Sequence, residues 1–312
     1  MFMKRLLALV AILIVISALV WMSTRPATTA PNGDLAVATS FYPLYYFASE
    51  IGGKHATVTN IVPAGSEPHE YEPTPRDIAA IEAADVVLLN GEGFESWGDR
   101  IAGSVTGTVL RLAEGMATLE GEHGHDEEEG AQHAEGEHDP HVWLSPALSR
   151  VMATRIADAF VAADPAHADD YRANATALDA KLATLDDAYR RGLAQCARRD
   201  IVTSHAAFGY IARDYDLQQI AIAGLSPEEE PSVQTLAAVA AEAKKRGATH
   251  IFFETLVPPD FSQTIAREIG AQTLALNPLE GLTDEEMSAG KNYVTEMQQN
   301  LKNLQLALAC TE

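Results

Sequence analysis

The chain has 312 residues, of which 47% are hydrophobic, enough for a large core and, by length, for two domains of ~150 residues each. It has 22 Lys and Arg residues and 44 Asp and Glu residues, which gives a formal net charge of −22. This balance argues against nucleic-acid binding, which requires a basic surface, so no nucleic-acid partner is expected.

The amino-terminal segment has the pattern of an export signal. Lys4 and Arg5 precede the apolar run LLALVAILIVISALVWM, and a basic start followed by an apolar core is typical of secretory signals. The best small-residue cleavage site is Thr28-Thr29-Ala30, and with no cysteine directly after the run a lipid anchor is not expected. Because the run is nearly long enough to span a bilayer, residues 1–33 are either a cleaved signal and linker or a retained membrane anchor. Both alternatives predict a periplasmic or otherwise extracytoplasmic protein.

Apolar runs and helix-like segments alternate in the first part of the chain. Strands are expected at 35–41, 58–62, 85–90 and 109–112. Helices are expected at 43–53, at 75–84 after the capping pair Thr74-Pro75, and at 94–101. This alternation predicts a parallel sheet with helices on both faces, in an amino-terminal lobe that spans residues 34–164.

Residues 120–138 form a run of His, Glu, Asp and Gly with almost no large apolar residue. Such a run cannot bury enough surface to offset its ordering entropy, so a mobile surface loop is expected. Histidines among acidic residues attract divalent cations loosely, which predicts an accessory low-affinity metal loop containing His123, His125, His133 and His138. The run ends at Asp139-Pro140-His141-Val142-Trp143-Leu144, where Pro and bulky apolar residues indicate a return to the folded body.

A helical pattern fills residues 146–196, with a break near Asp164-Pro165. The Ala-rich run after the break predicts a helix of about 28 residues and ~40 Å, longer than one domain of this size needs. We interpret residues 165–196 as a rigid linking helix that crosses from one lobe to the other.

The alternation restarts in a carboxy-terminal lobe at 197–312. Strands are expected at 200–203, 218–223, 250–254 and 272–276, and helices at 207–214, 232–246, 261–269 and 285–308. The predicted fold class is therefore α/β, with two Rossmann-like lobes, each a parallel sheet flanked by helices, joined by one long linking helix. Cys196 and Cys310 lie at predicted helix ends, and the sequence leaves open whether they form a disulfide or remain two thiols.

Two histidines and one short segment occupy positions where open α/β sheets place their ligands, outside the carboxyl ends of strands. The segment is NPLE at 277–280, which follows the strand expected at 272–276. His69 lies in the loop after the second strand, and His205 follows the strand at 200–203 directly. His141 comes after the acidic loop, at the return to the first lobe. Proline before His69 and His141 holds each imidazole on a rigid turn, which favours a ligand role. The remaining candidates are interpreted as ordinary exposed or hydrogen-bonded histidines: His55, His167 and His250.

Three motifs resemble the histidine motifs of the high-affinity zinc-binding proteins of bacterial ABC transporters, in the cluster A-I metal-binding family. They are PAGSEPHEYEPTP at 63–75, DPHVWLSP at 139–146 and SHAAFGY at 204–210. The likeness covers essentially the whole mature chain, and an acidic His-rich loop is itself a trait of the zinc branch. It implies that Zn²⁺ is the transported ligand, held between the lobes by His69, His141 and His205. It also implies an ABC permease and its ATPase as partners, with a monomeric binding protein.

The fourth ligand departs from the pattern of many relatives, which carry an Asp-Pro-Leu run after the last strand. Here Asn277 occupies the Asp position, and a neutral amide oxygen is a poor zinc ligand beside a carboxylate. Zinc-binding relatives with the same Asn-Pro-Leu-Glu run use its glutamate. The resemblance therefore favours Glu280 over Asn277, a water molecule or Glu67.

Alternatives remain for the metal and for the function. The similar manganese transporters place a carboxylate where His205 stands, so imidazole at this position favours zinc over manganese, while copper and nickel stay open. A zinc buffer or an adhesin would have the same site as a transport protein. An exported zinc hydrolase would use the three histidines and a water, but the chain has no His-Glu-x-x-His motif and no activated Ser or Cys. A non-enzymatic binding protein is therefore predicted.

Overall fold

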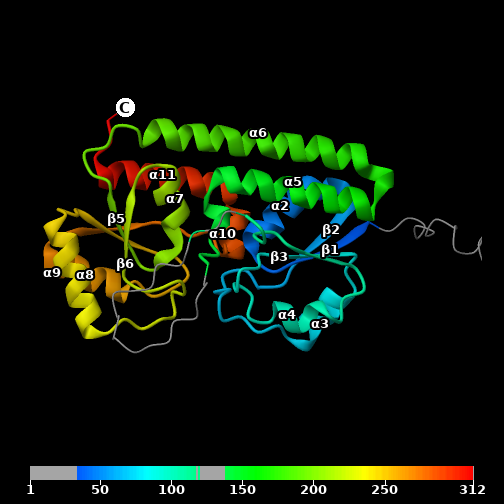
Figure 1. Ribbon diagram of the computed structural model, residues 1–312, viewed down its shortest axis with the longest axis horizontal. Coiled ribbons are helices and arrows are strands. Elements are labelled where there is room, and N and C mark those ends of the chain that lie inside the picture. Colours follow the sequence, from blue (N-terminus) through cyan, green and yellow to red (C-terminus); the bar gives the residue numbers. More distant parts are fainter. Residues whose placement is uncertain (1–33, 117–118, 120–137, 312) are drawn as a thin grey trace, which may run out of the picture. The chain divides into compact units, whose positions relative to one another are not determined.

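Two parallel four-stranded sheets form the framework of the computed structural model, which describes residues 34–116, 119 and 138–311 (Figure 1). The expected export signal at 1–33 lies outside the described residues. So do three of the four loop histidines, namely His123, His125 and His133. Within the part that is described, no helix has both the length and the apolarity needed to cross a membrane.

The first sheet has the strand order β2-β1-β3-β4. Its strands are β1 (Leu35–Thr39), β2 (Ala56–Asn60), β3 (Val86–Leu89) and β4 (Thr108–Arg111). All four residues of β3 are buried, as expected for an inner strand covered on both faces. The helices of this lobe are α2 (Tyr42–Gly52), α3 (Pro75–Glu82) and α4 (Gly98–Ala102). Thr74 caps the start of α3, as the sequence predicts, and it also forms a capping box with Asp77.

The second sheet repeats the same topology with the order β6-β5-β7-β8. Its strands are β5 (Asp200–Thr203), β6 (Gln218–Ala221), β7 (His250–Phe253) and β8 (Gln272–Ala275). The helices are α7 (Gly209–Asp214), α8 (Val233–Lys245), α9 (Asp260–Ile269), α10 (Asp284–Ser288) and α11 (Tyr293–Leu308). In each sheet the chain reverses its direction of winding beside the first strand, which creates a ligand crevice at the carboxyl ends of the strands.

A long helix joins the two lobes, as predicted. After α5 (Pro146–Ala163), the chain forms α6 (Ala168–Gly192), whose 25 residues extend ~38 Å. Helix α6 packs against α2 and α5 of the first lobe and against α11 of the second, and Figure 1 shows it passing over both. The side chains on its buried face are Tyr171, Leu178, Leu182, Leu185 and Tyr189.

Two predicted helices differ from the structure. The final helix expected at 285–308 is divided into α10 and α11, because Gly290 adopts a φ of 87° and Asn292 caps α11. The helix expected at 94–101 is shortened to α4. The buried carboxylate of Glu95 accepts hydrogen bonds from the backbone N–H groups of Asn90 and Gly91, which holds the preceding segment in a turn.

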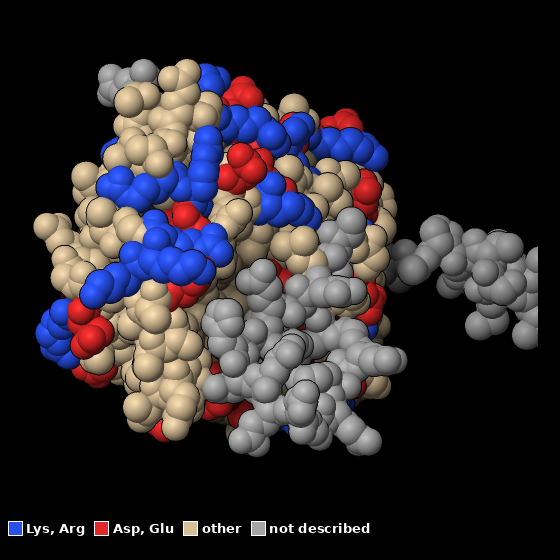
Figure 2. Space-filling model, turned by 60° about the vertical axis from the view of Figure 1, so that its left-hand side comes forward, with Lys and Arg blue, Asp and Glu red and all other residues tan. Residues whose placement is uncertain are grey.

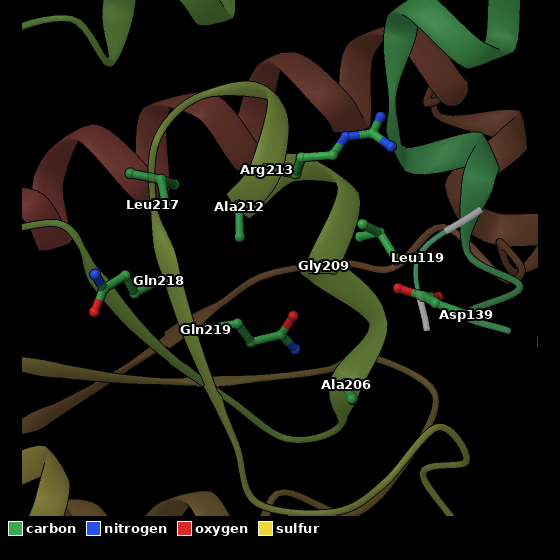
Figure 3. A pocket seen from close by; sticks show the side chains of 9 residues that line it. All are labelled: Leu119, Asp139, Ala206, Gly209, Ala212, Arg213, Leu217, Gln218 and Gln219. Atoms are coloured by element: carbon green, nitrogen blue, oxygen red, sulfur yellow. The ribbon is translucent and has the colours of Figure 1, made fainter. Parts of the chain in front are cut away.

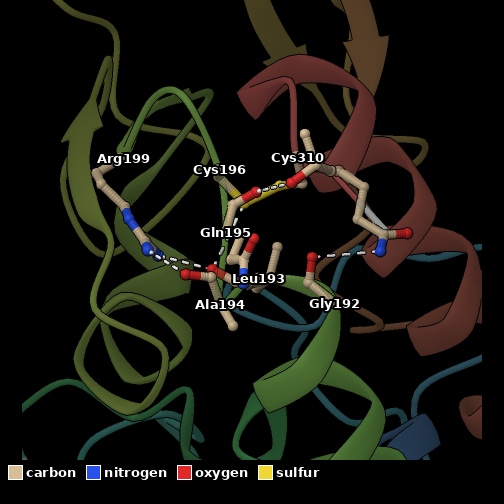
Figure 4. The surroundings of a disulfide bond; sticks show 9 residues. Gly192, Leu193, Ala194, Gln195, Cys196, Arg199 and Cys310 are labelled. Atoms are coloured by element: carbon tan, nitrogen blue, oxygen red, sulfur yellow. Dashed lines mark hydrogen bonds between the residues drawn. A yellow bond between two sulfur atoms is a disulfide. The ribbon is translucent and has the colours of Figure 1, made fainter.

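A disulfide joins Cys196, just after α6, to Cys310 at the end of α11 (Figure 4). Backbone hydrogen bonds flank it: the Ala197 amide donates to the Ala309 carbonyl, and the Arg198 amide to the Leu308 carbonyl. The side chain of Arg199 donates to the carbonyl oxygens at the end of the linking segment (Figure 4). The linking segment and the carboxy-terminal helix are therefore covalently joined at one end.

Lys and Arg side chains gather over part of the face that Figure 2 shows, with Asp and Glu side chains between them. One exposed network of this kind joins Arg246 to Glu242 and Asp200 at 2.7 Å each. Exposed pairs contribute little stability, so this pattern matters for solubility and association rather than for the fold.

Candidate metal centre

Four side chains that are far apart in the sequence converge in the structure: His69, His141, His205 and Glu280 offer ligand atoms that all lie within 4.8 Å of one another. Oε1 of Glu280 lies 3.3 Å from Nε2 of His69, 3.3 Å from Nε2 of His205 and 3.5 Å from Nε2 of His141. The Nε2 atoms of His141 and His205 are 3.2 Å apart. Zn–ligand bonds of ~2.0–2.1 Å in a tetrahedron put the donors about 3.3–3.4 Å apart. The four separations given above are close to this value, and no pair in the cluster is more than 4.8 Å apart.

The segment that carries His141 is locked to the loop that carries Glu280. The indole Nε1 of Trp143 donates to the carbonyl of Pro278 at 2.7 Å, and Trp143 is fully buried. Its ring packs against Phe41 and Phe94 of the first lobe. One aromatic side chain therefore fixes the spacing between two candidate ligands from different lobes.

Asn277 shapes the loop that presents Glu280. Its side-chain Oδ1 accepts a hydrogen bond from the Leu279 amide at 2.8 Å, and Leu279 adopts a φ of 58°. Its backbone is held by Asn300, which accepts from the Asn277 amide at 2.9 Å and donates to its carbonyl at 2.7 Å. Because the Asn277 oxygen is engaged in this turn, the geometry favours Glu280 as the fourth ligand. Glu67, the other candidate, accepts from the His69 amide at 2.9 Å and so supports the loop of that histidine.

Two further carboxylates orient the buried imidazoles. Oδ1 of Asp139 accepts from both the ring Nδ1 and the backbone amide of His141, at 2.7 and 2.9 Å. Oε1 of Glu254 lies 2.5 Å from Nδ1 of His205 and also accepts from the Ser204 hydroxyl. A carboxylate on Nδ1 keeps the proton there and leaves Nε2 free for a metal. Sequence reasoning missed Glu254, because its contact with His205 depends on β7 lying next to β5 in space.

The site is closed to solvent except at His69. His141 and His205 are 0% exposed and Glu280 1%, whereas the His69 side chain is 9% exposed. A cavity of about 260 Å³ adjoins this histidine, and its lining includes His138, the one loop histidine among the described residues. The cavity is also lined by Glu70, Glu92 and Glu229. The most exposed member of the cluster thus lies beside acidic side chains.

The cluster is electrostatically complementary before any ion binds. Burial would raise the pKa of Glu280, but His205, together with His141 and His69, holds it well below its ordinary value. Burial would lower the pKa of His205, but Glu254 and Glu280 raise it well above its ordinary value. The pKa of His141 is raised against burial by Asp139 and Glu280, whereas burial lowers that of His69. The carboxylate of Glu280 and the imidazole of His205 thus each favour the charged form of the other.

Zinc binding should weaken as the pH falls and should release protons at neutral pH. Zinc binds the neutral imidazole, so it must displace the proton that the raised pKa of His205 retains. The loss of affinity should begin above the ~6.5 of free imidazole and approach tenfold per pH unit for each displaced proton. Titration calorimetry in buffers of different ionisation enthalpy measures both quantities. A flat pH profile without proton release would contradict a histidine site.

Two lobes of parallel sheet and a buried cluster of three imidazoles and one carboxylate between them define a class of protein: two-lobed α/β proteins built to hold a metal ion. Within this class, the chain belongs to the family of the zinc-uptake complex component A, periplasmic (ZnuA), whose model matches residues 37–307.

Named relatives and solved structures are similar over most of the chain. The zinc-binding lipoprotein AdcA of Streptococcus pneumoniae (strain R6) is 40% identical over 283 residues, which cover 88% of this chain and 56% of AdcA. The high-affinity zinc uptake system protein ZnuA of Bacillus subtilis is 37% identical over 291 residues, 92% of this chain and 91% of ZnuA. The crystal structure of the Zn(II)-bound ZnuA-like domain of S. pneumoniae AdcA has a TM-score of 0.76 and 37% identity, covering 88% and 99% of the two chains. The chain thus spans little more than half the length of the AdcA relative.

Proposed function

We propose that this protein is an extracytoplasmic, high-affinity zinc-binding protein that delivers zinc to an ABC-type membrane permease. The observation that carries the proposal is the buried cluster of His69, His141, His205 and Glu280. Its donor atoms all lie within 4.8 Å of one another, and the four separations of 3.2–3.5 Å among them suit a tetrahedral zinc site. Three imidazoles and a single carboxylate favour zinc over manganese, which prefers oxygen ligands. Family membership and the zinc-related names of the similar proteins support the same assignment.

The partners we propose are the permease and its ATPase, with the binding protein acting as a monomer. Residues 1–33 serve as export signal or anchor and linker, which puts the protein in the periplasm or an equivalent compartment. The rest of the chain is divided into a first lobe at 34–164, a linking helix at 165–196 and a second lobe at 197–312. The acidic segment 120–138 acts as an accessory, low-affinity zinc-collecting loop.

A binding role fits the donor set better than catalysis does. A catalytic zinc site keeps one coordination position open for water, whereas four protein donors in this cluster fill a tetrahedron. The zinc hydrolase alternative therefore lacks the open position that its chemistry needs. The alternatives of zinc buffer and adhesin share the site and differ from transport only in whether zinc enters the cell.

Zinc uptake by cells tests this proposal. Deleting the gene should slow growth in chelator-treated medium and abolish high-affinity uptake of radioactive zinc, and excess zinc should restore growth. Wild-type protein should complement the deletion, and a His205→Ala protein expressed at the same level should not. If the deletion strain takes up zinc normally although the purified protein has a tight zinc site, the transport role is wrong, and the protein is a zinc buffer or an adhesin.

A further inference from the structure

The hydroxyl of Tyr210 connects the second lobe to the backbone beside the metal centre. Tyr210 lies in α7 and is fully buried. Its hydroxyl donates to the backbone carbonyl of Asp139 at 2.7 Å and accepts from the backbone amide of Leu119 at 3.1 Å. The Asp139 amide in turn donates to the Leu119 carbonyl at 2.9 Å. A single hydroxyl of the second lobe thus contacts the two residues of the first lobe that flank segment 120–138.

Gly209, the residue before Tyr210 in α7, leaves room for the side chain of Asp139. A Cβ atom on Gly209 would lie 2.7 Å from Oδ2 of Asp139 and 3.3 Å from a methyl group of Leu119. Figure 3 shows the side chains of Leu119 and Asp139 beside Gly209. The absence of a side chain at Gly209 therefore lets the carboxylate of Asp139 approach α7 closely.

A second contact from the same face of α7 reaches the far end of the segment that carries His141. The Ser145 hydroxyl donates to Oδ2 of Asp214 at 2.5 Å. Tyr210 and Asp214 are four residues apart on a helix and therefore share a face. The segment from Asp139 to Ser145 is held by α7 at both ends, with His141 between them.

We propose that Tyr210 is a positioning residue for the metal centre: its hydroxyl fixes the backbone of Asp139, whose carboxylate orients the imidazole of His141. The proposal deepens the zinc-binding function proposed above and rests on it. The carboxylate of Asp139 accepts both the ring Nδ1–H and the amide N–H of His141. Any freedom gained by Asp139 is therefore transmitted to the ring of a candidate ligand. The same hydrogen bonds connect Leu119, the residue before segment 120–138, to Asp139.

The test compares Tyr210→Phe with Tyr189→Phe in the otherwise intact protein. Tyr189 is a matched control, because it is also fully buried and its hydroxyl also donates to a backbone carbonyl, that of Met297, at 2.7 Å. Both variants should lose similar thermal stability. Only Tyr210→Phe should raise the zinc Kd, by roughly three- to tenfold, below the ~10–100-fold typical of losing a carboxylate that bonds directly to a ligand histidine. In an Asp139→Asn background the same change should have a smaller effect, because both substitutions act on one pathway.

Two outcomes would overturn the proposal: a zinc Kd unchanged by Tyr210→Phe, or the same change in Tyr189→Phe. If Tyr210→Phe does not fold, Gly209→Ala gives an independent answer. Its added Cβ displaces the Asp139 carboxylate and should also raise the zinc Kd, and an unchanged Kd would refute the coupling. The wild-type titration tests the proposed function separately, since the absence of a tight site there would refute zinc binding before any variant is compared.

Discussion

Replacing Glu280 with glutamine should weaken zinc binding about 10²- to 10⁴-fold, since removing one charged partner from a buried pair costs about 3–5 kcal/mol. Glu280 is the sole anionic donor of the four-residue cluster, and its oxygen lies within 3.5 Å of all three imidazoles. Glutamine keeps the shape of the side chain but offers a neutral oxygen, which is a poor zinc ligand. Competition with a chelator of known affinity measures the Kd.

Glu67→Gln is the matched control for this substitution. Glu67 accepts from the His69 amide, and burial together with Glu280 raises its pKa to about 7, so it is already partly neutral at physiological pH. We therefore expect this substitution to change the zinc Kd only a few-fold. The ligand set would be wrong if Glu67→Gln abolished tight binding while Glu280→Gln preserved it. If both variants bound as wild type, neither carboxylate would be a ligand.

The sequence carried enough information to predict the lobes and the candidate ligands because both follow from local patterns. Apolar runs that alternate with capped helices indicate a parallel sheet, and the strand at 200–203 is predicted with the bounds of β5. Parallel sheets place ligands at the carboxyl ends of strands, so the sequence predicts His69 and His205 as candidate ligands. The prediction of Glu280 as a ligand also required the family resemblance, because only comparison with relatives shows that Asn277 stands where many of them carry Asp.

Local sequence patterns do not predict which side chains from distant segments come into contact. The hydrogen bond of Glu254 to His205 depends on β7 lying next to β5, which strand order in space determines. The bond from Trp143 to Pro278 spans 135 residues, and no local pattern indicates it. His55 and His167 were interpreted singly, yet their rings stack 3.8 Å apart at the amino-terminal end of the linking helix. Periodicity predicts elements, but the partners of a side chain depend on how those elements pack.

Removing the disulfide should cause a large loss of stability. Cys196 and Cys310 are 114 residues apart and enclose nearly all of the second lobe. Closing a loop of this length restricts the unfolded chain and is worth about 4–5 kcal/mol in the chain-entropy model. The Cys196→Ala/Cys310→Ala protein should therefore unfold at a lower urea concentration, with Tm lowered by roughly 10 °C. Urea and thermal unfolding followed by circular dichroism measure the two effects.

The zinc Kd of the folded double variant separates stability from function. The disulfide lies at the carboxyl ends of the linking segment and α11, and neither cysteine belongs to the four-residue cluster. The local backbone bonds between Ala197 and Ala309 and between Arg198 and Leu308 should keep the two ends together without it. We expect the zinc Kd to stay within a factor of two or so, since additivity holds for distant sites. An unchanged unfolding midpoint would contradict the entropic argument. A large loss of zinc affinity in protein that is still folded would mean that the disulfide also sets the position of the lobes at the metal centre.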